Sequence, residues 1–442
     1  MKKLILTLCL TATGTFAAVA QMRLTLDQAL DLALSENPTI KVAEMEVQRY
    51  DYVKRQTWGG LLPQVSVTGQ VNHSFIVQQM SKGFSLGNDP YTTLSGAVDA
   101  SVPLFAPQVY RMMKMNDKQM ATAVEAARSS RITLTAEVKK AFYNILLAEQ
   151  SLDVLRESEA TVQRTVDDTQ VQYQNGLTSE YDLLTAQVQL SNLKPSILQT
   201  ENSIRIAKLM LKMYLSIPED VEIEVVGELD ALRDDVLAGT DGLTTDVTDN
   251  SDLRSLELQE EVLRRSLKAA NAGRMPTLAA FGSASYTGND MEPFNFGGAA
   301  ATDDSRYFWT HPISVGLQLS VPIFSGLTKM NRSRELKNQI SQLSLQRSYA
   351  RQQIDVQVRS ALNDLLTARE TMYAQELTVE QACKAYKISD TRYRAGAGTI
   401  LELNSAQLSQ TQAQLNFSQA IYDYLSAKAE YDRIVGREHG NK

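Results

Sequence analysis

The sequence contains the same ordered set of motifs twice, at a nearly constant spacing. The sequence SVPLF at 101–105 returns as SVPIF at 320–324. A Tyr-x-x-Gly pattern that begins at Tyr173 returns at Tyr393, with almost the same offset. This period is far longer than the unit of a solenoid repeat. The repeat therefore indicates an internal duplication in which each half is a complete structural module.

Each module begins with helical patterns. Apolar residues recur with helical spacing over 26–34, and a second helical stretch is predicted from about 39 to 58. The counterpart in the second module is predicted over 252–272. Asn37 precedes the stretch at 39–58 and returns as Asn250 before the stretch at 252–272, at a similar offset. The asparagine and the helical stretch near the start of each module are therefore repeated, as are the later motifs.

Strand patterns follow the helices in both modules. Apolar and polar residues alternate over 65–71 and 94–104, and again over 278–286 and 313–323. This period of two predicts strands with one apolar and one wet face. A length of about ten residues also matches a strand that spans a bilayer.

Long segments at 72–93 and 287–312 join the two strands of each pair. The second segment contains Tyr307, Phe308 and Trp309. These aromatic residues fit either part of an aromatic girdle at a membrane interface or loop side chains that pack locally.

Very long helices come next. No proline or glycine lies inside the segment that follows Pro107 and ends at Asn175. Its roughly 68 residues would span about 100 Å as one helix. Apolar positions recur in steps of three and four over 124–173, and the same steps recur in the second module over 344–393. The pattern resumes after each Tyr-x-x-Gly turn and predicts coiled-coil helical hairpins.

The order of these patterns defines the predicted organisation of the chain. Lys2 and Lys3, the apolar segment 4–10 and the Ala-x-Ala site at 18–20 predict a secretory signal peptide. The predicted segments are a signal peptide at 1–20; a first repeat at 21–217, with a β-hairpin at about 64–105 and a helical hairpin at about 107–216; a small side domain and linker at 218–250; a second repeat at 251–436, with a β-hairpin at about 277–324 and a helical hairpin at about 326–436; and a C-terminal tail at 437–442.

Composition excludes several classes of protein. A formal net charge of −7 without a basic stripe argues against a nucleic-acid partner. Two cysteines exclude a disulfide scaffold and a cysteine-based zinc module. The three histidines have no partner at ligand spacing, and the chain lacks the G-x-S-x-G, phosphate-loop and dinucleotide motifs. We expect no catalytic residues, no metal site and no cofactor.

The strand count constrains assembly. Four membrane-type strands cannot close a barrel, because about eight is the practical minimum. An open edge in lipid leaves unpaired backbone groups at a cost of several kcal/mol each. If these strands span a bilayer, several copies must share one barrel. The expected class is an α+β membrane protein that acts as a conduit.

The chain resembles the TolC-type outer-membrane efflux proteins, also called outer membrane factors. The resemblance rests on the opening LTLDQAL at 24–30 with Asn37-Pro38, the Val-Pro-Leu/Ile-Phe strand ends and the two Tyr-x-x-Gly turns, and it covers essentially the whole mature chain. It implies a homotrimer with a shared 12-stranded β-barrel and a periplasmic α-helical barrel. It also implies an outer-membrane location that extends into the periplasm, and contact with outer-membrane lipid. The implied function is a passive exit duct of a tripartite efflux or type I secretion system.

The resemblance gives the two turns between long helices a role. Gly176 and Gly396 fit the left-handed position at which a helix ends, which is sufficient to explain both glycines. In the family these turns dock a periplasmic adaptor protein, which connects the duct to an inner-membrane transporter of RND or ABC type. The docking residues carried over are Asn175, Gly176, Leu177 and Thr178 in the first turn, and Gly396, Ala397, Gly398 and Thr399 in the second.

The resemblance also implies a pore constriction near these turns. Tyr393 matches the family's latch tyrosine, Asp182 its hydrogen-bonding aspartate, and Glu402 the first acidic position of the constriction. A three-fold ring of Glu402 would favour cations. The chain departs from the pattern at Gly398 and Ser405, which replace the latch arginine and the second acid. The alternative interpretation is that Tyr393 is a heptad residue and Glu402 an ordinary solvated one.

Two other functions remain open from the residues alone. A periplasmic adaptor also has a secretory signal and a long helical hairpin, but the duplicated strand pairs do not suit it. A secreted coiled-coil structural protein would have no use for the alternating strands. The cargo of a duct is left open among drugs, metal ions, lipids and secreted proteins.

Overall fold

The computed structural model describes residues 22–75, 91–238, 243–290 and 308–438. The predicted signal peptide at 1–20 lies outside the described residues, as do Tyr307 and positions 439–442 of the predicted tail. The described chain forms two compact units. Unit 1 comprises 22–44, 125–238, 243–254 and 349–438, and unit 2 comprises 45–75, 91–124, 255–290 and 308–348.

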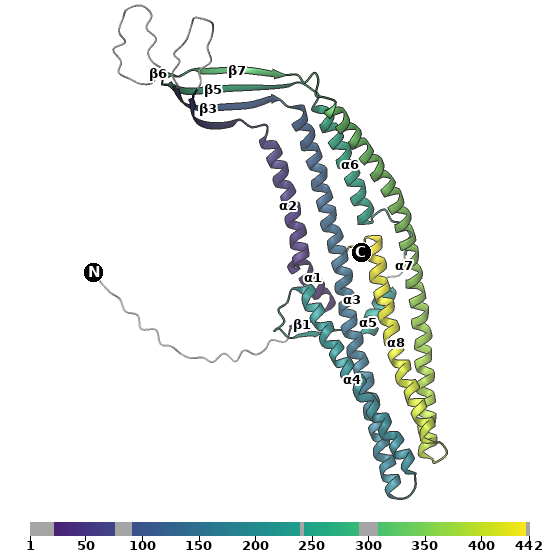
Figure 1. The fold of residues 1–442 in the computed structure, drawn as a ribbon. Helices are drawn as coiled ribbons and strands as arrows, with labels where there is room; N and C mark the ends of the chain where they lie inside the picture. The colour runs from purple at the N-terminus through teal and green to yellow at the C-terminus, as the bar shows by residue number, and fades with distance from the viewer. Residues whose placement is uncertain (1–21, 76–90, 239–242, 291–307, 439–442) are drawn as a thin grey trace, which may run out of the picture. The chain divides into compact units, whose positions relative to one another are not determined.

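Four long helices dominate the chain (Figure 1). They are α3 (Pro107–Gln174), α4 (Glu180–Leu215), α7 (Thr328–Arg394) and α8 (Ile400–Val435). With 68 and 67 residues, α3 and α7 are each about 100 Å long. The uninterrupted helix predicted after residue 107 is therefore confirmed. Among the described helices, none is both long and apolar enough to cross a membrane.

The core of unit 1 forms where the long helices pack on the short α1 (Leu26–Glu36). Phe142 and Ile145 of α3, Leu211 of α4 and Tyr431 of α8 are almost fully buried there. The Tyr431 hydroxyl donates to the Thr244 carbonyl at 2.6 Å and accepts from the Thr244 amide at 2.9 Å. These residues are far apart in the sequence, so the apolar heptad stripes of the long helices contribute to one shared core.

The described chain begins with a strand of a small parallel sheet. β1 (Met22–Leu24) pairs with β4 (Ile223–Val225), which precedes the short helix α5 (Leu229–Ala238). Leu24, Ile223 and Val225 are buried. β4 lies in the predicted side domain at 218–250, but its pairing with β1 is not apparent from the sequence, because strands of three residues are too short to show alternation.

Asn37 and Asn250 occupy matching junctions between helices in unit 1. Asn37 lies before α2 (Pro38–Gly59); its Nδ2 donates to the Tyr214 carbonyl at the end of α4, at 2.8 Å. Asn250 lies before α6 (Ser251–Ala272); its Nδ2 donates to the Ile434 carbonyl at the end of α8, at 2.7 Å.

The amide oxygen of each asparagine binds the helix that follows. It accepts the Thr39 amide at 2.8 Å in the first junction and the Leu253 amide at 3.0 Å in the second. Each side chain therefore satisfies the end of one helix and the start of the next.

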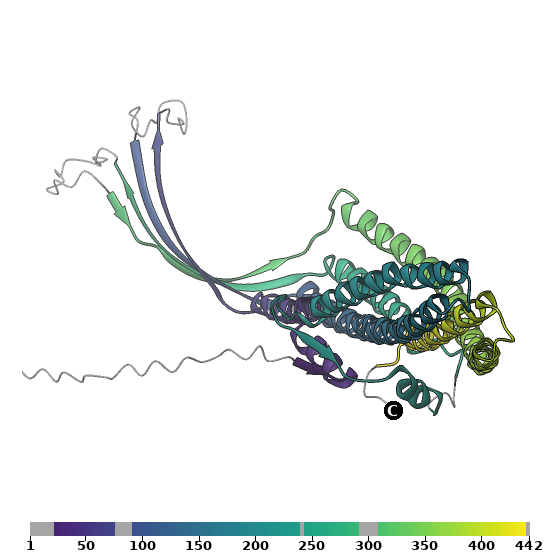
Figure 2. The same cartoon turned by 90° about the horizontal axis from the view of Figure 1, so that it is seen from below.

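Unit 2 contains one antiparallel sheet, a curved ribbon in Figure 2. Its main strands are β2 (Gln64–Ser74), β3 (Tyr91–Phe105), β5 (Thr277–Asn289) and β7 (Ile313–Ser320), and the short β6 (Phe308–Thr310) also pairs with β5. The strands therefore extend into the segments predicted as loops. Trp309 of β6 stacks on Tyr286 with 4.7 Å between ring centroids, so it packs on the sheet.

The end of the second hairpin differs from the prediction. The alternating pattern predicts a strand through position 323 and a hairpin to about 324, but β7 ends at Ser320. Pro322 has no backbone N–H to donate to a strand ladder, and Ile323 is 94% exposed. Apolar alternation therefore continues past the last strand residue.

The junction geometry predicts that Asn37→Ser lowers the local opening free energy between α2 and α4 by about 1–3 kcal/mol. Serine retains the helix cap but leaves the Tyr214 carbonyl without its donor. Asn37→Asp should cost more, because it sets a carboxylate against that carbonyl. Hydrogen exchange at the ends of the two helices, followed by mass spectrometry on the intact protein, measures the effect.

Asn192→Ser on the exposed face of α4 is the matched control, and Asn250→Ser should repeat the effect between α6 and α8. Equal exchange rates in Asn37→Ser and Asn192→Ser would show that the junction hydrogen bond contributes nothing.

Candidate functional site

The two turns between long helices lie at the same end of unit 1 (Figure 1). In the first turn Gly176 has φ of 73°, a conformation that strains any residue with a Cβ atom. The Gly176 amide donates to the Tyr173 carbonyl at 2.9 Å, and the Leu177 amide donates to the Gln172 carbonyl at 2.8 Å. This pair of bonds is the Schellman motif that ends a helix.

The second turn has the same geometry. Gly396 has φ of 71°, and its amide donates to the Tyr393 carbonyl at 3.0 Å. The Ala397 amide donates to the Arg392 carbonyl at 2.9 Å. A Cβ atom at Gly398 would lie 3.2 Å from the Tyr393 nitrogen, so the chain passes close to the end of α7 there.

Each following helix starts with a capping residue. The Ser179 hydroxyl accepts the Asp182 amide at 3.2 Å, and the Thr399 hydroxyl accepts the Glu402 amide at 3.2 Å. Asp182 and Glu402 therefore occupy equivalent positions relative to the caps of α4 and α8. The Ser-x-x-Asp and Thr-x-x-Glu spacing resembles a capping box and could have identified both caps from the sequence.

Asp182 uses its side chain to close its own turn. Its carboxylate accepts the Ser179 hydroxyl at 2.8 Å and the Thr178 hydroxyl at 2.9 Å. The hydrogen bond from Ser179, followed by that from Thr178, lowers the pKa of Asp182. Because the folded pKa lies below the unfolded one, Asp182 stabilises the fold above its unfolded pKa. This contribution is lost as the pH falls through the folded pKa.

Glu402 makes a different contact. Its carboxylate lies 3.6 Å from the Arg392 guanidinium, which also donates to the Ala397 carbonyl at 3.3 Å. The Glu402 and Arg392 side chains are about half exposed, at 51% and 55%. Such an ion pair contributes little to stability. Glu402 therefore keeps an accessible negative charge, and Arg392 is a neighbour that sequence analysis missed.

Tyr393 is anchored to α3. Its hydroxyl lies 3.0 Å from the hydroxyl of Thr169, which is fully buried. Thr169 donates in turn to the Thr165 carbonyl at 2.7 Å, so it can accept from Tyr393. Within the described part of the chain, Tyr393 and Asp182 are not hydrogen-bonded to each other. Thr169 shares its heptad stripe with apolar residues, and nothing in the sequence marks it as the partner of Tyr393.

The surfaces of the two turns consist mainly of small and apolar residues. Leu177 is 78% exposed at the first turn, and Tyr181 and Leu184 extend this apolar patch along α4. Asn175 and Gly176 are also exposed, whereas Thr178 is half-buried under its bond to Asp182. In the second turn Gly396, Ala397 and Thr399 are exposed and Gly398 is half-buried. Both turns therefore present small or apolar surface.

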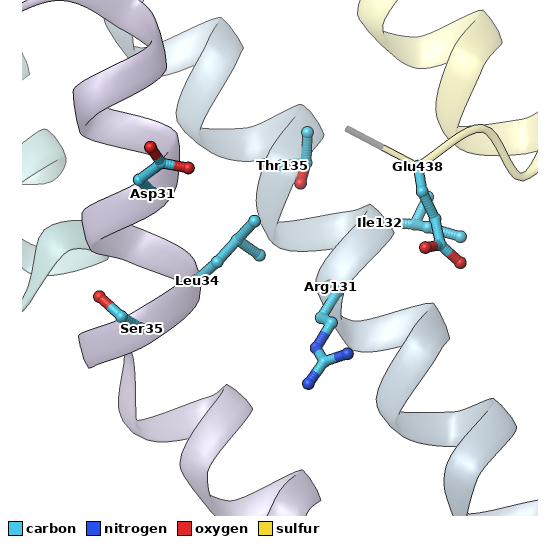
Figure 3. A pocket seen from close by; sticks show the side chains of 7 residues that line it. All are labelled: Asp31, Leu34, Ser35, Arg131, Ile132, Thr135 and Glu438. Carbon is cyan, nitrogen blue, oxygen red and sulfur yellow. The ribbon is translucent and has the colours of Figure 1, made fainter. Parts of the chain in front are cut away.

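Unit 1 also has a groove between α1 and α3 (Figure 3). Its volume is about 390 Å³, and Leu34 and Ile132 provide its apolar lining. Arg131 is paired with Glu44 at 2.7 Å, outside the groove. Glu438 likewise binds Arg128. Because these charges are engaged elsewhere, they do not converge on a ligand, and we do not assign one to this groove.

Comparison with known proteins places the chain in a family. The family model for outer membrane efflux proteins matches residues 29–215 and 247–437. The chain belongs to the outer membrane efflux protein family. The matched residues contain both turns, all four long helices up to position 437, and the sheet strands from β2 to β7. The resemblance to TolC-type proteins is confirmed, and it favours the duct over the adaptor.

Individual relatives agree with this assignment. Outer membrane protein TolC of Vibrio cholerae is 22% identical, over 99% of this chain and 96% of that protein. Alkaline protease secretion protein AprF of Pseudomonas aeruginosa is 23% identical, over 92% of this chain and 83% of that protein. The solved CmeC outer membrane channel of Campylobacter jejuni has a TM-score of 0.72 at 14% identity, covering 94% of this chain and 87% of that one. The fold is that of TolC-like outer-membrane channels.

The Tyr393–Thr169 bond predicts a measurable coupling. Tyr393→Phe and Thr169→Val should each lower the free energy of unfolding by about 1 kcal/mol, since each removes one partner of a bond at a buried hydroxyl. The double variant should lose less free energy of unfolding than the sum of the losses in the two single variants. Denaturant unfolding of unit 1, followed by hydrogen exchange at α3 and α7, measures the cycle.

Thr378→Val is the control, because Thr378 is exposed and its hydroxyl bonds to a carbonyl within α7. Additive effects of Tyr393→Phe and Thr169→Val would exclude an energetic link between the two hydroxyls.

Proposed function

We propose that the protein is a passive exit duct in the outer membrane, formed by three copies of the chain, for a tripartite efflux or type I secretion system. Family membership over most of the chain carries this proposal. The names of two relatives specify protease secretion for AprF and toluene efflux for TtgC. Energy would come from a partner, so we assign the chain no enzymatic activity and no cofactor.

The open edges of the sheet support a shared barrel. Among the described strands, β2 pairs only with β3, and β7 pairs only with β5. Both strands therefore present a row of backbone groups on one side, which a bilayer would leave unpaired at high cost. Pairing β7 of one copy with β2 of the next removes every edge. Four main strands from each of three copies give the proposed 12-stranded barrel, embedded in outer-membrane lipid.

Exposed apolar stripes on the helices support the same assembly. Besides its buried face, α4 has a second stripe on its exposed surface. The stripe consists of Leu184, Val188, Leu198, Leu209 and Met213, which are 40–66% exposed. In unit 1, α7 has a comparable stripe of Tyr349, Val356, Tyr373, Leu377 and Ile388. We propose that α4 of one copy packs on α7 of the next to close a periplasmic helical barrel.

The repeated order of elements supports an internal duplication. Helix, two long strands and a pair of long helices occur as α2, β2, β3, α3, α4 and again as α6, β5, β7, α7, α8. The two Schellman turns and the two asparagine junctions repeat at matching positions. In the proposed trimer the two modules would alternate around the duct.

The turns are the proposed contact with the periplasmic adaptor. Their exposed small and apolar residues permit close packing against another helical tip. The adaptor would connect the duct to an inner-membrane transporter of RND or ABC type. We propose that Glu402, Asp182 and Tyr393 lie at the closed end of the duct. Asp182 would hold the first turn, Tyr393 would hold α7 on α3, and Glu402 would supply the charge.

The duct proposal predicts that the protein is extracted by detergent from outer membranes as a heat-labile trimer. Reconstituted in a planar bilayer, it should form channels of low conductance. Electrophoresis with and without boiling, followed by single-channel recording, tests both points. Recovery of the protein in the soluble or inner-membrane fraction, or trimers that never conduct, would contradict the proposal.

The proposed constriction predicts opposite effects from two neighbouring residues. Glu402→Ala should lower the ratio of cation to anion permeability, because it removes a negative charge from the axis. Arg392→Ala should raise that ratio, because it removes the cation beside Glu402. Reversal potentials in a salt gradient measure both variants. Unchanged selectivity in Glu402→Ala would exclude Glu402 from the lumen.

A further inference from the structure

The strand register sorts the sheet of unit 2 into two chemically different faces. One row across the strands consists of Val67, Val98, Ala284 and Ile313, which are aligned in the ladder. The next row points to the other face and consists of Ser66, Asp99, Ser283 and Ser314. The rows on either side repeat this difference: Val65, Ala100, Gly282 and Val315 share the apolar face. The sheet therefore has one apolar and one polar side.

Asp99 differs from everything else on the polar face. It is the single Asp, Glu, Lys or Arg within the described strands β2, β3, β5, β6 and β7. Its three aligned neighbours are serines. Their hydroxyls can donate hydrogen bonds to a carboxylate, but they carry no positive charge that would neutralise it. Asp99 is half-buried and forms no ion pair within the described part of the chain.

A neighbouring copy would not compensate this charge through its strands. Every copy has the same described strands, which contain no Lys or Arg. A serine lies at each end of the Asp99 row, on the edge strands β2 and β7. Pairing of these edges between copies would therefore extend a neutral, hydroxyl-rich wall around the negative charges.

From this placement we infer that Asp99 is a charge-selectivity residue of the membrane segment, separate from Glu402, and that it favours cationic solutes over anionic ones. The inference rests on the proposed duct, in which the apolar face meets lipid and the polar face lines the lumen. Three copies would then place three uncompensated carboxylates at one level of the barrel. A charge at the wall of a water-filled pore that is surrounded by lipid is screened less than at an open surface.

The size of the effect follows from screening. Three carboxylates about one Debye length from the axis would enrich cations about twofold at roughly 0.15 M salt. The enrichment should grow as the salt concentration falls, because the Debye length increases. A neutral hydroxyl-lined wall has no such salt dependence.

The test uses the full-length protein reconstituted in planar bilayers under a KCl gradient. Asp99→Asn should lower the ratio of cation to anion permeability about twofold or more, with a larger effect at low salt. Asp99→Lys should shift the channel toward anions. Ser283→Asn is the matched control, because it adds the same amide to the same row without removing a charge, and it should leave the ratio unchanged.

Two further observations separate the possible failures. The Asp99→Asn effect should persist in a Glu402→Ala background, because the two residues act at different sites. Every variant should first be shown to give heat-labile trimers, so that misfolding is not read as lost selectivity. If the wild-type trimer does not conduct, the proposed function itself is wrong. If it conducts and Asp99→Asn has the wild-type reversal potential at all salt concentrations, the inference about Asp99 is wrong.

Discussion

Backbone hydrogen bonding is the constraint on which the rest of the structure depends. Every long helix ends with carbonyl groups that lack a partner within the helix. At the two turns, Schellman motifs around Gly176 and Gly396 supply donors to these carbonyls. At the two junctions, backbone amides likewise bind carbonyls at the ends of α4 and α8, and the side-chain amides of Asn37 and Asn250 each supply one further donor. The edges of β2 and β7 are different, since the described chain offers them no second strand. This contrast is the physical argument for assembly: the helix ends are completed within one copy, and the sheet is not.

The sequence predicted those elements whose pattern is long and local. The length of α3, the two-faced strands and the glycine turns each repeat a signal over many residues or occur at a position where few residue types fit. The asparagine junctions were visible only as a repeat of Asn37 at Asn250, because their partners lie 177 and 184 residues away in the chain. The pairing of β1 with β4 is equally remote, and each strand has only three residues. Long-range partners cannot be read from local periodicity.

The candidate site shows the same division. The capping residues Ser179 and Thr399 follow a short sequence rule, so they were predictable in principle. The partner of Tyr393 was not, because Thr169 contributes one buried hydroxyl to a stripe that otherwise predicts apolar packing. Arg392 was missed for another reason. Its contact with Glu402 depends on how the second turn folds back, and Gly398 permits this path by lacking a side chain where space is tight.

The two turns also show how one capping motif can give two acidic residues different roles. Asp182 and Glu402 occupy the same position in their capping sequences, and the amide of each donates a hydrogen bond to the preceding cap. Asp182 has the shorter side chain, and its carboxylate returns to Ser179 and Thr178. Glu402 extends instead toward Arg392 and remains half exposed. The first turn is therefore stabilised by its acid, whereas the second is held by its backbone, by Thr399 and by Arg392. Glu402 is therefore the more accessible acid of the two, and this asymmetry is the reason why the proposed constriction assigns the luminal charge to Glu402 rather than to Asp182.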